Sequence, residues 1–239
     1  MLIYHRVGGG SDSAVDLPVD VFRRQLAHLA EHHRVISLDA AVRAIEAGEA
    51  ADGVVITFDD GAADYAEHAA PALIEAGLPS TLYLVTSAPD VGTLPWGVPS
   101  VSWAALRDLT ATGLVDVQSH THDHRVLHHA DGATTADQLD RSIELIADRL
   151  GSAPQHFAYP KAVPGSRPAR LEVAARFRSA ALARHGRNAH LADLHVLRRT
   201  PISRQDDMDD FAAKAKGGRR LEGWARHQVA SVRYRRATT

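Results

Sequence analysis

The 239-residue chain contains no cysteine. This absence excludes disulfide bonds, thiolate metal ligands and a cysteine nucleophile. It does not identify the compartment, because secreted proteins can also lack cysteine. Any metal ion bound by this chain must therefore be held by histidine, aspartate or glutamate side chains.

Long apolar runs and a strong net charge are also missing. No stretch approaches the roughly 18 apolar residues of a membrane-spanning helix, and the formal net charge is -2. This balance gives no overall attraction to nucleic acid or to an anionic membrane, so neither is expected as a partner. The first residues, Met-Leu-Ile-Tyr-His-Arg, do not have the pattern of a signal peptide. We therefore expect a cytoplasmic protein, with export through a leader removed before this numbering as the alternative.

The length suits one domain with a full core and is too short for two ordinary domains with a linker. Hydrophobic residues make up 45% and charged residues 23% of the chain, which is typical of globular proteins. Residues 214–239 carry eight lysines or arginines against one acid, Glu222. We expect one domain over residues 1–215 and a basic tail over 216–239, which we interpret as a solvated terminus.

Short apolar runs alternate with amphipathic stretches, as in repeated strand and helix units. The predicted strands are Leu2–Tyr4, Val35–Leu38, Val54–Phe58, Ser80–Val85, Val115–Ser119, His156–Tyr159, Ser179–Leu182 and Val196–Arg199. The predicted helices are Val21–His32, Ala63–Ala76 and Thr135–Leu150. Since no glycine-rich nucleotide-binding fingerprint is present, the pattern favours an α/β barrel over an open doubly wound sheet. The proline- and glycine-rich stretch 86–102, which contains Trp96, predicts a surface loop of functional length.

Two adjacent carboxylates, Asp59 and Asp60, follow a predicted strand directly and precede Gly61. Neighbouring strand residues point to opposite faces, so the pair can take different roles at one site only where the backbone bends. Glycine permits such a bend, and a bound cation would relieve the repulsion between the two charges. The alternative interpretation is a helix N-cap, for which aspartate is common.

Three histidines, His120, His122 and His124, follow the predicted strand Val115–Ser119. Neutral imidazole is the commonest side-chain ligand of zinc and related metals. His120 and His124 can face one ion together, in which case His122 points elsewhere. Two histidines with one carboxylate leave a coordination position open for water, as in catalytic sites. The histidines and the paired aspartates together favour a metal site over the cap.

The segment Thr57–Gly61, followed by Ser119–His124, resembles the first two motifs of the polysaccharide deacetylase family, carbohydrate esterase family 4. The segments Leu2–Val7 and Phe157–Pro160 extend this resemblance over roughly residues 1–215, and the start of the chain is similar to the poly-N-acetylglucosamine deacetylases. The resemblance implies the NodB-homology fold, a deformed (β/α) barrel with about seven strands. It also implies a divalent metal ion and hydrolysis of acetyl groups on sugars.

The resemblance also implies roles for individual residues. Asp59 would be the general base, and His5 the general acid, with His195 as a weaker alternative. The backbone N–H of Lys161 would bind the oxyanion. The metal ligands would be Asp60, His120 and His124, holding Zn²⁺ or alternatively Co²⁺, Ni²⁺ or Mn²⁺. From the residues themselves, Trp96 is a candidate for stacking on a sugar, and Arg199 for neutralising the base or a ligand carboxylate. Tyr159 of the third motif completes the substrate-binding candidates.

The sequence departs from the family pattern in the later motifs. Ala158 stands where many members have an arginine, and Lys161–Ala162 replaces Tyr-Gly. A tryptophan-containing fourth motif is not visible, and the last predicted strand lacks its usual histidine. We expect a metal-dependent hydrolase, acting on carbon–nitrogen bonds other than peptide bonds, that deacetylates N-acetylated sugars. A deformylase or other small-amide hydrolase of the same fold, and a non-catalytic carbohydrate-binding relic, are the alternatives.

Overall fold

The computed structural model describes residues 1–188 and 193–218. Their main element is an eight-stranded parallel sheet in the order β10-β1-β4-β5-β6-β7-β8-β9. The strands are β1 (Leu2–Tyr4), β4 (Ile56–Asp60), β5 (Ser80–Leu84), β6 (Val115–Ser119), β7 (His156–Ala158), β8 (Ser179–Leu182), β9 (Leu197–Arg198) and β10 (Thr200–Pro201). A second sheet pairs β2 (Arg6–Val7) with β3 (Asp16–Leu17).

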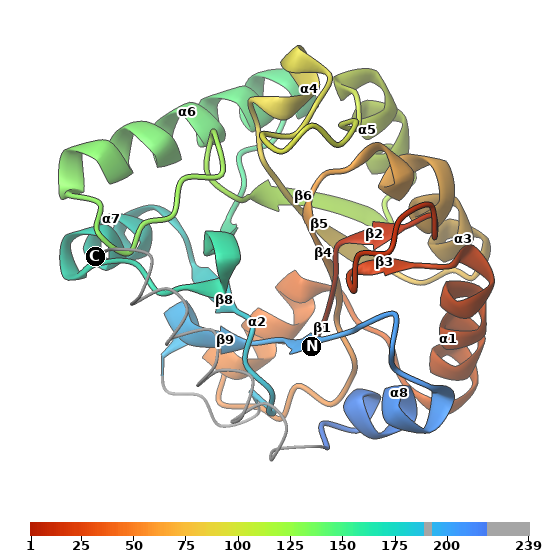
Figure 1. The fold of residues 1–239 in the computed structure, drawn as a ribbon. Helices are drawn as coiled ribbons and strands as arrows, with labels where there is room; N and C mark the ends of the chain where they lie inside the picture. The colour runs from red at the N-terminus through yellow and green to blue at the C-terminus, as the bar shows by residue number, and fades with distance from the viewer. Residues whose placement is uncertain (189–192, 219–239) are drawn as a thin grey trace.

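The sheet curls into a nearly closed barrel (Figure 1). Its two edge strands, β9 and β10, are consecutive in the chain and are separated only by Arg199. One short segment therefore joins both edges of the sheet. The predicted deformed α/β barrel is confirmed. The strand expected at Val196–Arg199 is the two-residue β9, and β10, which begins after Arg199, pairs with the opposite edge.

Helices surround the strands (Figure 1). They are α1 (Val19–His32), α2 (Leu38–Glu46), α3 (Ala70–Glu75), α4 (Ala88–Val91), α5 (Trp103–Thr110), α6 (Gly132–Leu150), α7 (Arg167–Arg176) and α8 (Met208–Ala215). Shorter helical turns are η1 (Tyr65–Ala69), η2 (Pro160–Ala162) and η3 (Leu194–Val196). Helix α2 packs its apolar face against buried residues of β5, β7, β8 and β9, so it closes one end of the barrel.

The strand predicted at Val35–Leu38 is wrong. Only Val35 makes an isolated bridge, to Val54. The Ser37 side chain accepts a hydrogen bond from the Ala40 N–H and caps α2, which begins at Leu38. The cap satisfies a free backbone N–H at the start of the helix and so favours the helix over a longer strand.

The predicted helix Ala63–Ala76 begins as the π-helical turn η1 and continues as α3. Pro71 lies at the junction and has no N–H to donate to the preceding turn, which explains the local widening. The helix predicted at Thr135–Leu150 is confirmed and starts three residues earlier, at Gly132. The Asp131 side chain caps it by accepting from the Thr134 N–H.

An aromatic cluster packs the outer face of the sheet against α1 and η1. The ring of Phe58 lies 5.2 Å from Tyr4, 5.9 Å from Phe22 and 4.9 Å from Tyr65, and all four side chains are buried. Because side chains alternate along a strand, Phe58 on the outer face leaves Thr57 and Asp59 for the barrel interior. The same packing that forms the core thus orients a carboxylate inward.

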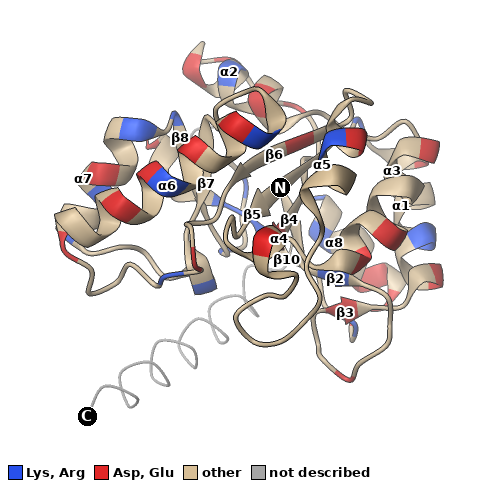
Figure 2. Ribbon diagram, turned by 90° about the horizontal axis from the view of Figure 1, so that it is seen from above, with Lys and Arg blue, Asp and Glu red and all other residues tan. Residues whose placement is uncertain are grey.

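Acidic and basic residues are mixed over the outer helices (Figure 2). In the described residues, none of the helices combines the length and hydropathy that a membrane span requires.

Helix α8 packs against α1, with the ring of Phe211 5.9 Å from that of His28. The basic tail predicted over 216–239 lies, from residue 219 onward, outside the described residues.

We predict that Phe58→Ala destabilises the fold by about 3–5 kcal/mol, the usual cost of removing a buried aromatic side chain. Urea unfolding followed by circular dichroism measures this change. Leu171→Ala is the control, since Leu171 is 64% exposed. A loss below about 1 kcal/mol for Phe58→Ala would show that this cluster does not anchor the sheet.

Candidate active site

Asp59 is buried near the end of β4 and forms a two-pronged ion pair with Arg199. Its Oδ1 and Oδ2 accept hydrogen bonds from Arg199 at 2.5 and 2.8 Å, and Arg199 also donates to Thr57 Oγ1 at 3.2 Å. Burial alone would raise the pKa of Asp59, but the Arg199 guanidinium overcomes this effect and the pKa lies below its ordinary value. Asp59 is therefore ionised at neutral pH.

Asp60 points to a different partner set because the backbone bends there. Its φ is +77° and that of Gly61 is +92°, so the chain leaves the strand in the left-handed region. A Cβ at position 61 would lie 2.5 Å from the Leu84 side chain, so only glycine fits there. The bend brings Asp60 Oδ1 within 3.5 Å of His120 Nε2 and 3.4 Å of His124 Nε2.

The two histidines present their Nε2 atoms to Asp60. His120 Nδ1 donates to the carbonyl of Ala158 at 2.8 Å, which leaves Nε2 without its proton in the neutral ring. Desolvation, together with the neighbouring His120, lowers the pKa of His124 to about 3. The His124 ring is thus neutral at physiological pH, the state in which imidazole binds a metal.

The fit to a metal ion follows from these distances. The ligand atoms of Asp60, His120 and His124 all lie within 4.8 Å of one another, the one such group found in the described part of the chain. Ligands bonded to zinc at about 2.0–2.1 Å in tetrahedral geometry lie about 3.3 Å apart. The observed 3.4 and 3.5 Å match this spacing closely, so the three residues fit a single ion.

His122 points away from this group, as the sequence predicts. Its Nδ1 lies 3.1 Å from Thr86 Oγ1, and its Nε2 accepts a hydrogen bond from Arg141 at 2.7 Å. Both ring nitrogens are therefore engaged elsewhere.

A cavity of about 510 Å³ opens over the carboxylates and histidines. It is lined by Asp59 and by residues from the ends of β1, β4, β6 and β7 and the loop after β5, among them His5, Asp60, Trp96, His120, His124 and Lys161. His5 follows β1, and its Nδ1 is buried without a hydrogen-bond partner among the described residues. His5 therefore has an imidazole nitrogen available at the wall of this cavity.

Trp96 lies at the tip of a short hairpin in the predicted functional loop. Leu94 N–H donates to the Val98 carbonyl at 2.7 Å, and Gly97, with φ +82°, follows the turn. Pro95 and Gly97 suit a tight hairpin of this kind. The Trp96 ring is 43% exposed and lies 4.9 Å from the His124 ring. The ring can therefore contact a ligand that approaches Asp60, His120 and His124.

Lys161 stands in η2 with φ +56°, and its backbone N–H donates to no group in residues 1–188 and 193–218. The next N–H, of Ala162, is occupied by the Tyr159 carbonyl at 2.9 Å. The sequence-predicted oxyanion donor therefore has a free N–H at the cavity wall.

Backbone strain is concentrated around this cavity. Among the described residues, the non-glycine positions with positive φ are Asp60, Thr121, His124, Lys161 and Ala162. All belong to the turns that carry the ligand and oxyanion candidates. Such conformations cost of order 1–3 kcal/mol each, and they cluster at functional sites.

Three other candidates lie away from the cavity lining. Tyr159 is buried in a hydrophobic cluster, with its ring 5.1 Å from Phe157. Arg199 is fully buried and contacts Asp59, so its position suits holding the base and not touching a ligand. His195 Nε2 donates to the carbonyl of Phe177, just before β8 begins, at the opposite end of the strands.

Two contacts at this site have no sequence signal. The Ala158 carbonyl orients His120, and the Tyr83 ring lies 4.9 Å from the Arg199 guanidinium. Strand alternation in the predicted strand Ser80–Val85 places Tyr83 on one face, but only the closed barrel brings Arg199 to it.

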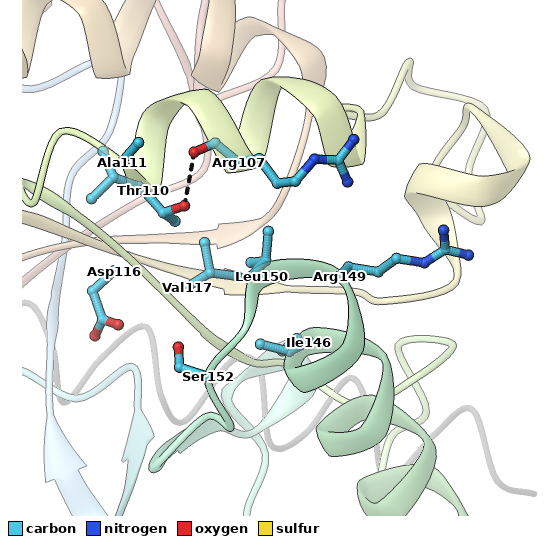
Figure 3. A pocket seen from close by; sticks show the side chains of 10 residues that line it. Arg107, Thr110, Ala111, Asp116, Val117, Ile146, Arg149, Leu150 and Ser152 are labelled. Carbon is cyan, nitrogen blue, oxygen red and sulfur yellow. Dashed lines mark hydrogen bonds between the residues drawn. The ribbon is translucent and has the colours of Figure 1, made fainter.

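A second hollow of about 440 Å³ lies between the ends of α5 and α6 and the start of β6 (Figure 3). It is thus at the opposite end of the strands from the carboxylates. Its lining includes Asp116, Arg107 and Arg149 but no histidine. This hollow therefore shares no residue with the group Asp60, His120 and His124.

The polysaccharide deacetylase model matches residues 47–177. Among curated proteins, no sequence matches.

Several solved structures share the fold. Streptococcus pyogenes deacetylase PplD, in complex with acetate, is 20% identical with a TM-score of 0.79, covering 90% of this chain and 96% of that one. IcaB from Ammonifex degensii is 23% identical with a TM-score of 0.75, covering 90% and 94%. The deacetylase domain of BpsB from Bordetella bronchiseptica is 22% identical with a TM-score of 0.67, covering 84% and 94%. At these identities the likeness shows the fold alone.

We predict that His124→Ala weakens zinc binding by more than the roughly 10- to 100-fold cost of losing a second-shell partner. Isothermal titration of chelator-treated protein with zinc measures the affinity. The matched control is His122→Ala, which lies two residues from His120 but contacts Thr86 and Arg141 and not Asp60, so it should leave the affinity unchanged. Equal losses in both variants would contradict the assignment of the ligands.

Proposed function

The chain belongs to the polysaccharide deacetylase family, and we propose that it is a metal-dependent hydrolase that removes acetyl groups from N-acetylated sugars. The observation that carries this proposal is that two adjacent carboxylates, Asp59 and Asp60, have different neighbours. Asp60 lies between His120 and His124, whereas Asp59, 3.9 Å from His120 Nε2, is held ionised by Arg199. One suits metal binding and the other suits proton transfer. The substrate would be an acetylated polysaccharide, oligosaccharide or sugar conjugate.

Asp60, His120 and His124 would hold the ion, with zinc as the expected metal. When bound there, a divalent metal polarises the acetyl carbonyl and lowers the pKa of a water molecule. Asp59 then accepts the proton of the attacking water. Its low pKa makes it a weak base, which is sufficient where the water is already acidified.

The remaining cavity residues complete the reaction. The Lys161 N–H is free to donate to the oxygen that becomes negative as water adds to the carbonyl. His5, at the cavity wall, would give a proton to the departing amine, which leaves poorly without one. Trp96 offers an exposed ring for the sugar face.

Arg199 takes the positioning role that the third-motif arginine has in many family members. Ala158 occupies the expected position of that arginine, and its carbonyl orients His120 instead. Arg199 reaches Asp59 from the segment that closes the barrel. The departure at Ala158 therefore does not leave the base without its cation.

We predict that the zinc-loaded protein releases acetate from N-acetylglucosamine oligomers and that Asp59→Asn lowers this rate by about 10²–10⁴-fold, the range for loss of a general base. Chelation should abolish release. Acetate is measured enzymatically, with zinc content determined in the same samples.

If a stoichiometric metal is retained but no acetylated sugar is hydrolysed, the deacetylase proposal fails. Formate release from N-formyl sugars would then support the deformylase alternative. Sugar binding without metal binding or hydrolysis would support the carbohydrate-binding relic.

We predict that Arg199→Met moves the acid limb of the kcat/KM profile to higher pH. Burial raises the pKa of Asp59 once the guanidinium is gone, and the base must be ionised to accept a proton. The unpaired buried charge should also cost about 3–5 kcal/mol of unfolding free energy. Arg199→Lys keeps the charge and should shift the limb less. An unchanged acid limb in both variants would show that Arg199 does not control the base.

A further inference from the structure

We propose that Lys161 makes the mouth of the cavity a charge filter, which favours acetamido sugars carrying a nearby carboxylate and disfavours sugars carrying a free amine. This inference rests on the proposed deacetylase function and names its preferred substrate class. It concerns the Lys161 side chain, whereas the oxyanion role concerns its backbone N–H.

The Trp96 ring lies between the Lys161 ammonium and His124, one of the candidate metal ligands. Lys161 Nζ lies 5.1 Å from the centre of the Trp96 ring, and that ring lies 4.9 Å from His124. All three side chains line the same cavity. A sugar held with its acetyl group at the metal ligands would therefore carry its ring substituents, or a neighbouring sugar, past the ammonium.

The charge of Lys161 is not neutralised by the protein. In the described part of the chain, no carboxylate lies within ion-pair distance of its Nζ, and its partner is the Trp96 ring. A cation–π contact holds an ammonium in place without cancelling its charge. Arg6, the other lysine or arginine lining the cavity, donates to Asp64 at 2.8 Å and lies 3.6 Å from Asp16. Among the described residues that line the cavity, Lys161 is thus the lysine or arginine left for a ligand.

Both partners of the Lys161–Trp96 contact are carried by short, hydrogen-bonded turns. The turn at Lys161 is closed by bonds from Ala162 to Tyr159 and from Val163 to Pro160. The Trp96 hairpin is closed by the pair Leu94 and Val98. Holding the ammonium against the ring reduces the conformational freedom that usually makes an exposed lysine a weak binding partner.

The remaining charges of the site reinforce the effect. Asp59 and Arg199 cancel each other, and one carboxylate, Asp60, only half neutralises a divalent ion. In the metal-free protein the Asp60 side chain is only 14% exposed whereas Lys161 is exposed, so Lys161 is the charge that a ligand meets at the mouth of the cavity, and a bound ion would add to it. A carboxylate on the sugar is attracted, whereas the ammonium product of deacetylation, or an already deacetylated neighbouring unit, is repelled. The same repulsion would favour product release.

The test measures binding to chelator-treated protein, so that its readout does not depend on catalysis. Three matched trisaccharides are titrated calorimetrically. The first consists of three N-acetylglucosamine units. The second has one free amine in place of an acetamido group, and the third carries a lactyl ether carboxylate on its central unit. At low salt we expect the carboxylate form to bind tightest and the amine form weakest, with steps of roughly 3- to 10-fold. The steps should shrink as salt is added.

Lys161→Met, which keeps the backbone N–H, should bring the three affinities within about 2-fold of one another, and Lys161→Arg should retain their order. Lys216→Met is the control, because Lys216 follows α8 and does not line the cavity. An absence of charge order in the wild type, or an order that survives Lys161→Met, would overturn the filter.

Acetate release from the neutral trisaccharide by zinc-loaded protein is measured in parallel. Release without a charge order overturns the filter and leaves the deacetylase in place. A charge order that is lost in Lys161→Met, without any release, supports the filter as a binding property and overturns the deacetylase.

Discussion

The buried ion pair between Arg199 and Asp59 is the interaction on which both the barrel and the site depend. Arg199 separates β9 from β10, the two edges of the sheet, and its guanidinium reaches the inner face of β4. Burying two charges is costly unless their remaining hydrogen bonds are satisfied. Here Thr57, the Leu182 carbonyl and the Tyr83 ring surround the guanidinium. The ion pair that joins the closing segment to β4 is consequently the same one that keeps Asp59 ionised.

The strained turns at the carboxyl ends of the strands rest on this closed frame. Asp60 and His124 adopt left-handed backbone conformations that aspartate and histidine tolerate only at a cost. The packing of the strands beneath these turns offsets this conformational cost. In that packing, Phe58 fixes the face that β4 presents to α1. The helix α2 seals the other end. Rigid strands thus allow strained turns to hold the ligands in place.

Much of this arrangement could be predicted from the sequence, because it depends on local signals. Strand ends, the Asp59–Asp60–Gly61 bend and the exclusion of His122 all follow from alternation and spacing, and β6 and β8 have the predicted bounds. The strand expected at Val35–Leu38 failed because Ser37 caps a helix. The sequence could not decide which carboxylate Arg199 contacts, because that depends on how the barrel closes.

The contact between Lys161 and Trp96 could not be predicted from the sequence either, but it explains why a lysine is tolerated beside the candidate metal ligands. A positive charge there helps to keep the pKa of His124 low, after desolvation and His120. A low pKa preserves the neutral ring that a metal requires. The ammonium does not compete for the metal ligands, because the Trp96 ring holds it. The same cation therefore helps to keep the His124 ring neutral and leaves a positive charge at the mouth of the cavity, so that the state of a candidate metal ligand and the charge of the cavity both depend on one side chain.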